Sequence, residues 1–201
     1  MRPMPQEILR SNSDLFLPAA PNLAEWVYQT FFNEESSVYN EEHKHLRHAT
    51  IGFLWTNVPN TRGGKTILGE TEIVNPKGGK WQRERQLFQQ RQWFGIEPLD
   101  FLITFDANWC FHATDLEFMA LVEHELYHCG QKLDEWGTPR FSKETGLPLF
   151  AMRSHDVEEF SGIVRRYGLW KDDLREFAAA ACGPPSIGQV QIKQICGNCV
   201  R

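Results

Sequence analysis

The sequence predicts an α+β protein in which a small twisted mixed sheet packs on helices. Two observations predict this class. Apolar residues recur at helical spacing in some segments, and runs of β-branched and aromatic residues lie between turn signals in others. A third observation singles out one helix, because it carries the sequence HELYH at 124–128, an example of the pattern HExxH. The chain has 201 residues, of which 41% are hydrophobic and 12% aromatic, enough for the core of one domain.

The remaining elements follow from local patterns along the chain. Asn22 with Glu25 forms a capping pattern ahead of apolar residues at helical spacing. Gly95 is placed to end a helix rich in Gln and Arg. Helices are predicted over 22–32, 36–49, 78–95, 154–168 and 171–182, strands over 50–58, 65–74 and 99–107, and a loop over 131–153. The tail after residue 185 has the pattern of a short strand.

The helix that carries HExxH has clear limits in the sequence. Thr114 and Glu117 form a capping box, which satisfies two backbone N–H groups at a helix start. Gly130 is placed to end the helix, so we predict a helix over about 115–129. Side chains four residues apart share one face of a helix, so His124 and His128 can each point a ring nitrogen at one ion.

These residue types in this spacing indicate a zinc site. Imidazole nitrogens are good zinc ligands, and a catalytic site uses three protein ligands and leaves one position for water. Zinc lowers the pKa of that water to about 7, and Glu125, beside the first histidine, can take its proton. The competing interpretation is coincidence, because a pattern with three defined positions also occurs by chance.

The third ligand has to come from elsewhere in the chain. His155 is the preferred candidate, because the sequence offers a loop and a returning helix between His128 and this residue. Glu158 and Glu159 are rivals, since some zinc hydrolases use a glutamate from a second helix. If His155 is the ligand, Glu159 can instead orient a histidine by a hydrogen bond.

Composition and charge make other classes of function less favoured without excluding them. The formal net charge is −5, with 21 basic and 26 acidic residues, so a nucleic-acid interface is not indicated. No segment has the length and apolarity of a membrane span or a signal peptide, and a cytoplasmic protein is expected. The five cysteines are expected to be reduced thiols, including Cys196 and Cys199 in the tail.

Several segments in the same order resemble a known family. DFLITFDANW at 100–109, ALVEHELYHC at 120–129 and HDVEEF at 155–160 resemble the phage and prophage metallopeptidases, small proteins related to SprT-like and other minimal zincins. HKHLRHATIGFLWTNV and GGKWQRER are similar to the N-terminal part of that family. The resemblance covers about residues 22–180.

The resemblance implies a zincin-like fold with the HExxH on the active-site helix and an edge strand able to bind extended peptide. It implies Zn²⁺ as cofactor and a peptide or protein substrate. By this resemblance His124 and His128 match the first two zinc ligands, His155 the third, and Glu125 the general base. SprT-like proteins often carry a C-terminal zinc ribbon with two cysteine pairs, whereas this tail has only Cys196 and Cys199.

The sequence therefore predicts three parts: a flexible N-terminal arm over 1–20, a zincin-like metallopeptidase domain over 21–182, and a C-terminal tail over 183–201. The predicted function is zinc-dependent hydrolysis of peptide bonds with Glu125 as the base. The alternative is a zinc-binding module without catalysis that acts in phage or DNA-maintenance interactions. The presence of Glu125 favours catalysis, because a module that only binds zinc needs no carboxylate at that position.

Overall fold

The computed structural model describes residues 2–19, 22–192 and 197–198. The chain forms two compact units, Met1–Arg153 with Val190–Arg201, and Ser154–Gln189. The first unit contains a mixed sheet and most of the helices, which confirms the α+β class. The limits of the metallopeptidase domain, 21–182, remain a prediction.

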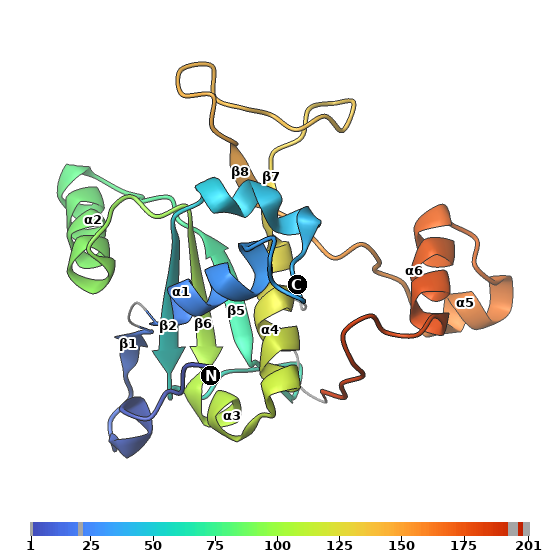
Figure 1. The fold of residues 1–201 in the computed structure, drawn as a ribbon, viewed down its shortest axis with the longest axis horizontal. Coiled ribbons are helices and arrows are strands. Elements are labelled where there is room, and N and C mark those ends of the chain that lie inside the picture. Colours follow the sequence, from blue (N-terminus) through green and yellow to red (C-terminus); the bar gives the residue numbers. More distant parts are fainter. Residues whose placement is uncertain (1, 20–21, 193–196, 199–201) are drawn as a thin grey trace. The chain divides into compact units, whose positions relative to one another are not determined.

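The sheet of the first unit has four strands: β1 (Phe16–Pro18), β2 (Ile51–Thr56), β5 (Gly69–Ile73) and β6 (Phe101–Asp106). Their order across the sheet is β1-β2-β6-β5 (Figure 1). β2 and β6 are parallel, and the two outer pairs are antiparallel. The sheet is therefore mixed, as predicted, and β5 is one of its edges.

Alternation of side chains places one face of the sheet in the core. On β6, Phe101, Ile103 and Phe105 are fully buried, whereas the residues between them are partly exposed. The register pairs Phe53 with Ile103, so apolar side chains of neighbouring strands lie on the same face. Burial of each such side chain stabilises the fold by roughly 1.5–3 kcal/mol.

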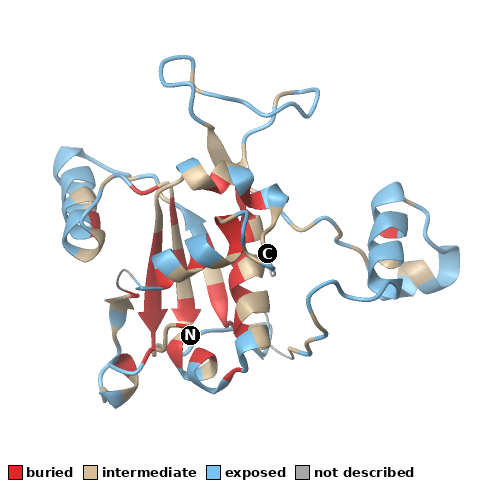
Figure 2. Cartoon of the chain, viewed as in Figure 1, coloured by how far each residue is buried: buried red, intermediate tan, exposed pale blue. Residues whose placement is uncertain are grey.

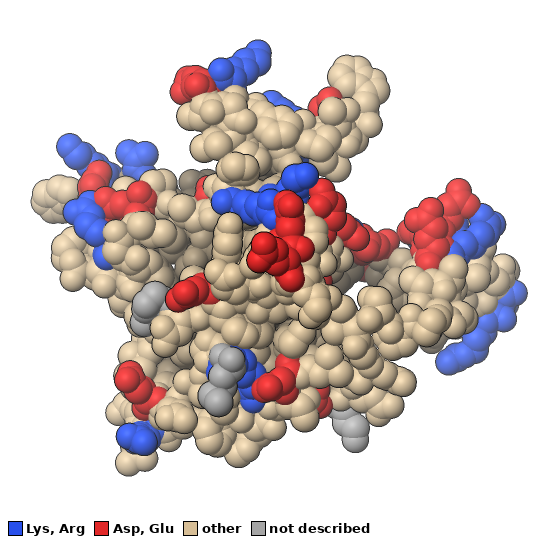
Figure 3. Space-filling model, viewed as in Figure 1, with Lys and Arg blue, Asp and Glu red and all other residues tan. Residues whose placement is uncertain are grey.

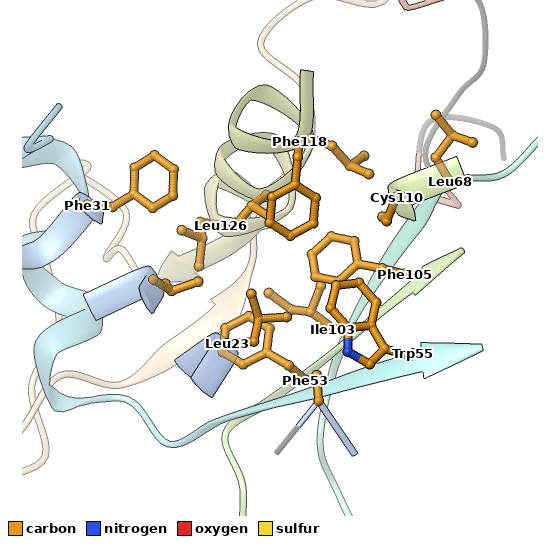
Figure 4. Packing of buried hydrophobic residues seen from close by; sticks show 14 of the residues in the cluster. Leu23, Phe31, Phe53, Trp55, Leu68, Ile103, Phe105, Cys110, Phe118 and Leu126 are labelled. Carbon is orange, nitrogen blue, oxygen red and sulfur yellow. The ribbon is translucent and has the colours of Figure 1, made fainter. Parts of the chain in front are cut away.

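Two helical segments cover this face. The first begins with α1 (Asn22–Val27) and continues as a π-helical turn over Tyr28–Phe32, and the second is α4 (Asp115–His128). Figure 4 shows Leu23 and Phe118 from these helices among side chains of the sheet such as Ile103 and Phe105. In Figure 2 the buried residues accordingly follow the strands and one side of α4.

Other elements surround this core. They are 3₁₀ helices at Ile8–Arg10 and Glu41–His48, the strand pair β3 (Thr61–Arg62) and β4 (Lys65–Thr66), and the helices α2 (Lys80–Phe94) and α3 (Ala107–His112). α2 ends at Gly95, whose φ of 72° is the left-handed conformation that favours glycine. A Cβ on Gly52 would meet Phe94 of α2 at 3.0 Å, so the end of α2 packs on the face of the sheet away from α4.

Residues 2–19, within the predicted N-terminal arm over 1–20, contact the core of the first unit, and the flexibility of this arm remains a prediction. Ile8 is 1% exposed within the core, and Leu17 on β1 pairs with Trp55 on β2. The side chain of Arg2 donates to Asp115 at 2.7 Å and to the backbone oxygen of Cys110 at 2.7 Å. No local hydrophobic pattern predicts this packing, because each contact that holds the segment joins residues far apart in the sequence.

The predicted loop over 131–153 contains a hairpin. β7 (Cys129–Gln131) pairs with β8 (Phe150–Met152) in antiparallel register, and two isolated bridges, Leu133 with Pro139 and Phe141 with Pro148, extend the pairing. The sequence did not predict these short strands, because the segment is polar and contains Gly and Pro. Backbone pairing does not require apolar side chains, so no hydrophobic pattern indicates it.

The second unit contains α5 (Ser161–Tyr167) and α6 (Asp172–Cys182). The helix predicted over 154–168 is therefore correct only in its second half, and His155 lies in a non-helical segment. None of residues 154–160 is buried, and Ser, His, Asp and Val are weak helix formers, so capping residues alone do not start a helix there.

The C-terminal tail shows no strand in residues 183–192, and the rest of the predicted strand lies largely outside the described residues. Among the helices that the structure describes, none is long and apolar enough to cross a membrane. On the face of the first unit drawn in Figure 3, Lys and Arg side chains lie among Asp and Glu side chains.

Candidate metal centre

Helix α4 positions the HExxH residues, and its start is built as the sequence predicts. The Thr114 hydroxyl accepts from the Glu117 backbone N–H at 3.2 Å, and a Glu117 carboxylate oxygen accepts from the Thr114 backbone N–H at 2.8 Å. The helix ends at His128, where the chain enters β7. The predicted helix over 115–129 is therefore confirmed to within one residue.

The two histidines of α4 lie one turn apart on the same face. Their ring centroids are 5.1 Å apart and the rings are nearly perpendicular, at 81°. His128 is only 4% exposed, and its Nδ1 lies 2.8 Å from the backbone oxygen of Arg153. A carbonyl oxygen can only accept, so Nδ1 carries the proton and Nε2 carries the lone pair that a metal requires.

The chain that follows β8 brings the third histidine to this face. The backbone N–H of Arg153 donates to the backbone oxygen of His128 at 2.9 Å. His155 follows two residues later in the chain, a span of at most about 7 Å when extended. One nitrogen each from His124, His128 and His155 lie within 4.8 Å of one another.

This group of three histidines could hold a metal ion. Three nitrogens at about 2.0–2.1 Å from a tetrahedral zinc ion would lie about 3.4 Å apart, and one nitrogen from each of these histidines lies within 4.8 Å of the other two. The bond between Nδ1 of His128 and a backbone carbonyl is the outer contact that metal-ligating histidines usually make. The residues present therefore fit a metal ion such as zinc, and the identity of the metal remains a prediction.

Glu125 lies on the side of α4 that faces the sheet. It is 0% exposed, and its Oε2 accepts from the Thr71 hydroxyl on β5 at 2.7 Å. The same hydroxyl lies 3.1 Å from the backbone oxygen of Glu125, so its one proton goes to the closer carboxylate. A buried carboxylate needs such a donor, because a buried charge is costly unless it is hydrogen-bonded.

Gly69, also on β5, makes room for this carboxylate. A Cβ at Gly69 would lie 2.7 Å from Glu125 Oε1, closer than van der Waals contact allows. Sequence reasoning found neither Gly69 nor Thr71 as site residues. A glycine within a strand can indicate the close approach of another group and was a usable signal for Gly69. Nothing in the sequence indicated Thr71.

The other histidines near α4 have structural contacts. His43 is 1% exposed, packs against Tyr127, and its Nε2 lies 3.7 Å from Glu123 Oε1. Asn40 donates to Glu123 at 2.8 Å and to the Tyr127 hydroxyl at 2.9 Å. Burial alone would raise the pKa of Glu123, but the nearby His43 ring and the hydrogen bond from Asn40 outweigh it, so the pKa is lowered.

This polar cluster borders a cavity of about 990 Å³ between the 3₁₀ helix Glu41–His48 and the β7–β8 hairpin. The cavity lining includes Tyr127 and Cys129 but neither His124 nor Glu125. His45 also lines it and has its Nε2 2.8 Å from the backbone oxygen of Cys129. The cavity is therefore separate from the group of three histidines.

The two rival glutamates do not belong to the histidine group, and Glu159 has contacts of its own. Glu159 accepts from the backbone N–H of Phe160 at 2.8 Å and lies 3.3 Å from Nζ of Lys171. The Phe160 N–H lowers the pKa of the Glu159 carboxyl. Neither Glu158 nor Glu159 belongs to the group of three histidines. Cys196 and Cys199 lie outside the described residues.

Comparison with known proteins agrees with this site. A family model described as "putative phage metallopeptidase" matches residues 24–180, or 157 of the 201 residues. No curated protein and no solved structure matched the chain. A metallopeptidase family implies a metal ion and a protein or peptide substrate. The match extends over more than three quarters of the chain and includes the HExxH helix and His155, and the chain therefore belongs to the family of putative phage metallopeptidases.

Proposed function

We propose that the protein is a zinc metallopeptidase of the zincin kind. In this proposal His124, His128 and His155 hold the zinc ion, and Glu125 is the catalytic base. The observation that carries it is a fully buried carboxylate, Glu125, adjacent in sequence to one member of a group of three histidines that fits zinc. Burial of a carboxylate costs free energy, and such groups are found where a site uses them for proton transfer. A catalytic role therefore explains why Glu125 is buried.

The side chains of this site suit the hydrolysis of a peptide bond. A bound zinc ion supplies a Lewis acid and lowers the pKa of water beside it to about 7. Glu125 accepts a proton from the attacking water and returns it to the leaving amine nitrogen. The Thr71 hydroxyl holds Oε2 of Glu125 in place, so the carboxylate does not have to reorient during the reaction.

The edge strand β5 suits an extended peptide. Its outward backbone groups include the N–H and C=O of Thr71 and the C=O of Gly69, and a peptide that adds a strand would bond to them. These groups belong to the same residues that contact Glu125, so a peptide paired there runs past the catalytic carboxylate.

A cytoplasmic location remains a prediction from the sequence.

The second candidate is a zinc-binding module that does not cleave peptides. The buried carboxylate of Glu125 favours catalysis over this reading, because a module that only binds metal gains nothing from burying a charge beside a ligand. We therefore rank the module second.

Metal content and hydrolysis test the proposal together. We expect one zinc per chain by elemental analysis of the wild type, loss of that zinc in His155→Ala, and its retention in Glu158→Ala, the matched control from the same segment. We expect the wild type to cleave fluorescein-labelled casein, and Glu125→Gln to retain zinc but lose cleavage by about 10³-fold or more. Zinc without cleavage in the wild type would favour the binding module, and absence of zinc would refute both readings.

A further inference from the structure

Gly197 and Asn198, near the C-terminus of the chain, lie against the edge of β5. β5 pairs with β6 through its other edge, so alternate residues of β5 direct their backbone groups outward. The backbone N–H of Gly197 donates to the outward oxygen of Gly69 at 2.5 Å. This contact joins residues 128 positions apart in the sequence, and both belong to the first compact unit.

Asn198 extends the contact by one residue along the edge. Its Oδ1 accepts from the backbone N–H of Thr71 at 2.8 Å, and its Nδ2 donates to the backbone oxygen of Thr71 at 2.8 Å. A carboxamide presents the same donor and acceptor as a peptide group. The Asn198 side chain therefore satisfies both outward groups of Thr71, as the backbone of an added strand would do.

The fit of this segment is selective for its sequence. Gly197 is buried, and a Cβ on it would lie 2.6 Å from Cγ and 2.7 Å from Cβ of Glu70. These atoms include Cβ of Glu70, which is fixed to the backbone. It cannot move aside as the carboxylate end of the side chain can. The side chain of Arg62 also donates to the backbone oxygen of Gly197.

The occupied edge lies directly beside the proposed base. Thr71 contacts Asn198 through its backbone and Glu125 through its hydroxyl. Gly69 contacts Gly197 through its backbone oxygen and leaves the space into which the Glu125 carboxylate fits. Any peptide that pairs with β5 at these two residues must therefore replace residues 197–198.

We propose that residues 197–198 act as an internal competitor of the substrate. They occupy the edge of β5 beside Glu125, and an extended peptide pairs with this edge only after they leave. This inference rests on the proposed function for its inhibitory part, whereas the docking of the segment is independent of catalysis. Two features allow this segment to bind β5. Gly197 fits because it has no side chain, and the carboxamide of Asn198 bonds to the backbone of Thr71.

Hydrogen exchange tests the docking without any need for activity. In the full chain, we expect the amide of Thr71 to exchange about tenfold faster in Asn198→Ala than in the wild type, because its acceptor is lost. Gln191→Ala is the matched control, since it removes a carboxamide from an exposed residue of the same tail. Equal exchange in the wild type and in Asn198→Ala would overturn the proposal.

Hydrolysis of fluorescein-labelled casein by the zinc-loaded protein tests the competition. We expect Asn198→Ala to lower KM by about fivefold or more with kcat unchanged, because two hydrogen bonds that hold the competitor are lost. A synthetic peptide of residues 193–201, with serine at both cysteine positions, should inhibit Asn198→Ala, and the same peptide with alanine in place of Asn198 should not.

The outcomes separate the two proposals. Faster exchange of the Thr71 amide with an unchanged KM would show that the segment only covers a strand edge, and would overturn the inhibitory role. Faster exchange with no hydrolysis by any variant would refute the proposed function, and the inhibitory role with it, while the docking stands. Faster exchange together with a lower KM and inhibition by the peptide would support both.

Discussion

Replacement of Thr71 by valine would remove the hydroxyl that holds Glu125 and leave the shape of the side chain almost unchanged. Thr71 is 2% exposed and its hydroxyl donates to Glu125 Oε2 at 2.7 Å, so no water takes its place readily. A hydrogen bond to a charged group contributes about 1.5–3 kcal/mol, and loss of a donor to a buried charged group costs at least that range. We therefore expect a free energy of unfolding lower by about 2 kcal/mol.

Thermal and chemical unfolding measure this loss. For a chain of this size, about 2 kcal/mol corresponds to a Tm lower by about 4–8 °C. Thr71→Ser retains the hydroxyl and should lose less than half as much stability. Thr66→Val, at an exposed position on β4, is the matched control and should change the free energy of unfolding by less than about 0.5 kcal/mol.

A double-mutant cycle isolates the contact itself. Thr71→Val combined with Glu125→Met, which removes the acceptor, should show a coupling free energy of about 1–2 kcal/mol, because the two side chains touch directly. In hydrolysis, Thr71→Val should lower kcat about tenfold with little change in KM, since the hydroxyl positions the base and does not touch the substrate. A coupling near zero, or a valine variant as stable as the wild type, would refute the argument that Thr71 positions Glu125.

Three further predictions follow from the same contacts. Gly69→Ala should lower the free energy of unfolding by about 1–3 kcal/mol and reduce kcat, because the added Cβ meets Glu125 Oε1 at 2.7 Å; urea unfolding that matches the wild type would contradict this. Arg2→Met should lower the free energy of unfolding by about 1–3 kcal/mol through the loss of donors to Asp115 and the Cys110 oxygen, whereas the exposed Arg10→Met should not. Burial lowers the pKa of His45, so the unfolded chain binds a proton at this residue more readily than the folded chain does. The free energy of unfolding should therefore be highest above pH about 6.5 and should fall as the pH drops through the folded-state pKa. Urea titrations at different pH should show a weaker pH dependence for His45→Gln than for the wild type.

The local elements were predictable because their causes are local. Helix α4 is specified by Thr114, Glu117 and the apolar spacing between them and Gly130, all within a few turns. The same holds for α1, α2, α6 and the strands β2, β5 and β6, whose spans match the predicted ones in large part, whereas β1 was not predicted. The predicted helix is absent over residues 154–160. Capping residues permit a helix there but do not stabilise one without buried contacts.

The sequence by itself determined the HExxH helix, the candidate ligands and the candidate base, because residues four apart on a helix share a face whatever surrounds them. Only the tertiary structure decided what holds these residues. Thr71 and Glu125 are 54 positions apart, and Thr71 and Asn198 are 127 apart. Such pairs depend on the order in which strands join the sheet, and that order comes from burial of the whole apolar face and not from any local pattern.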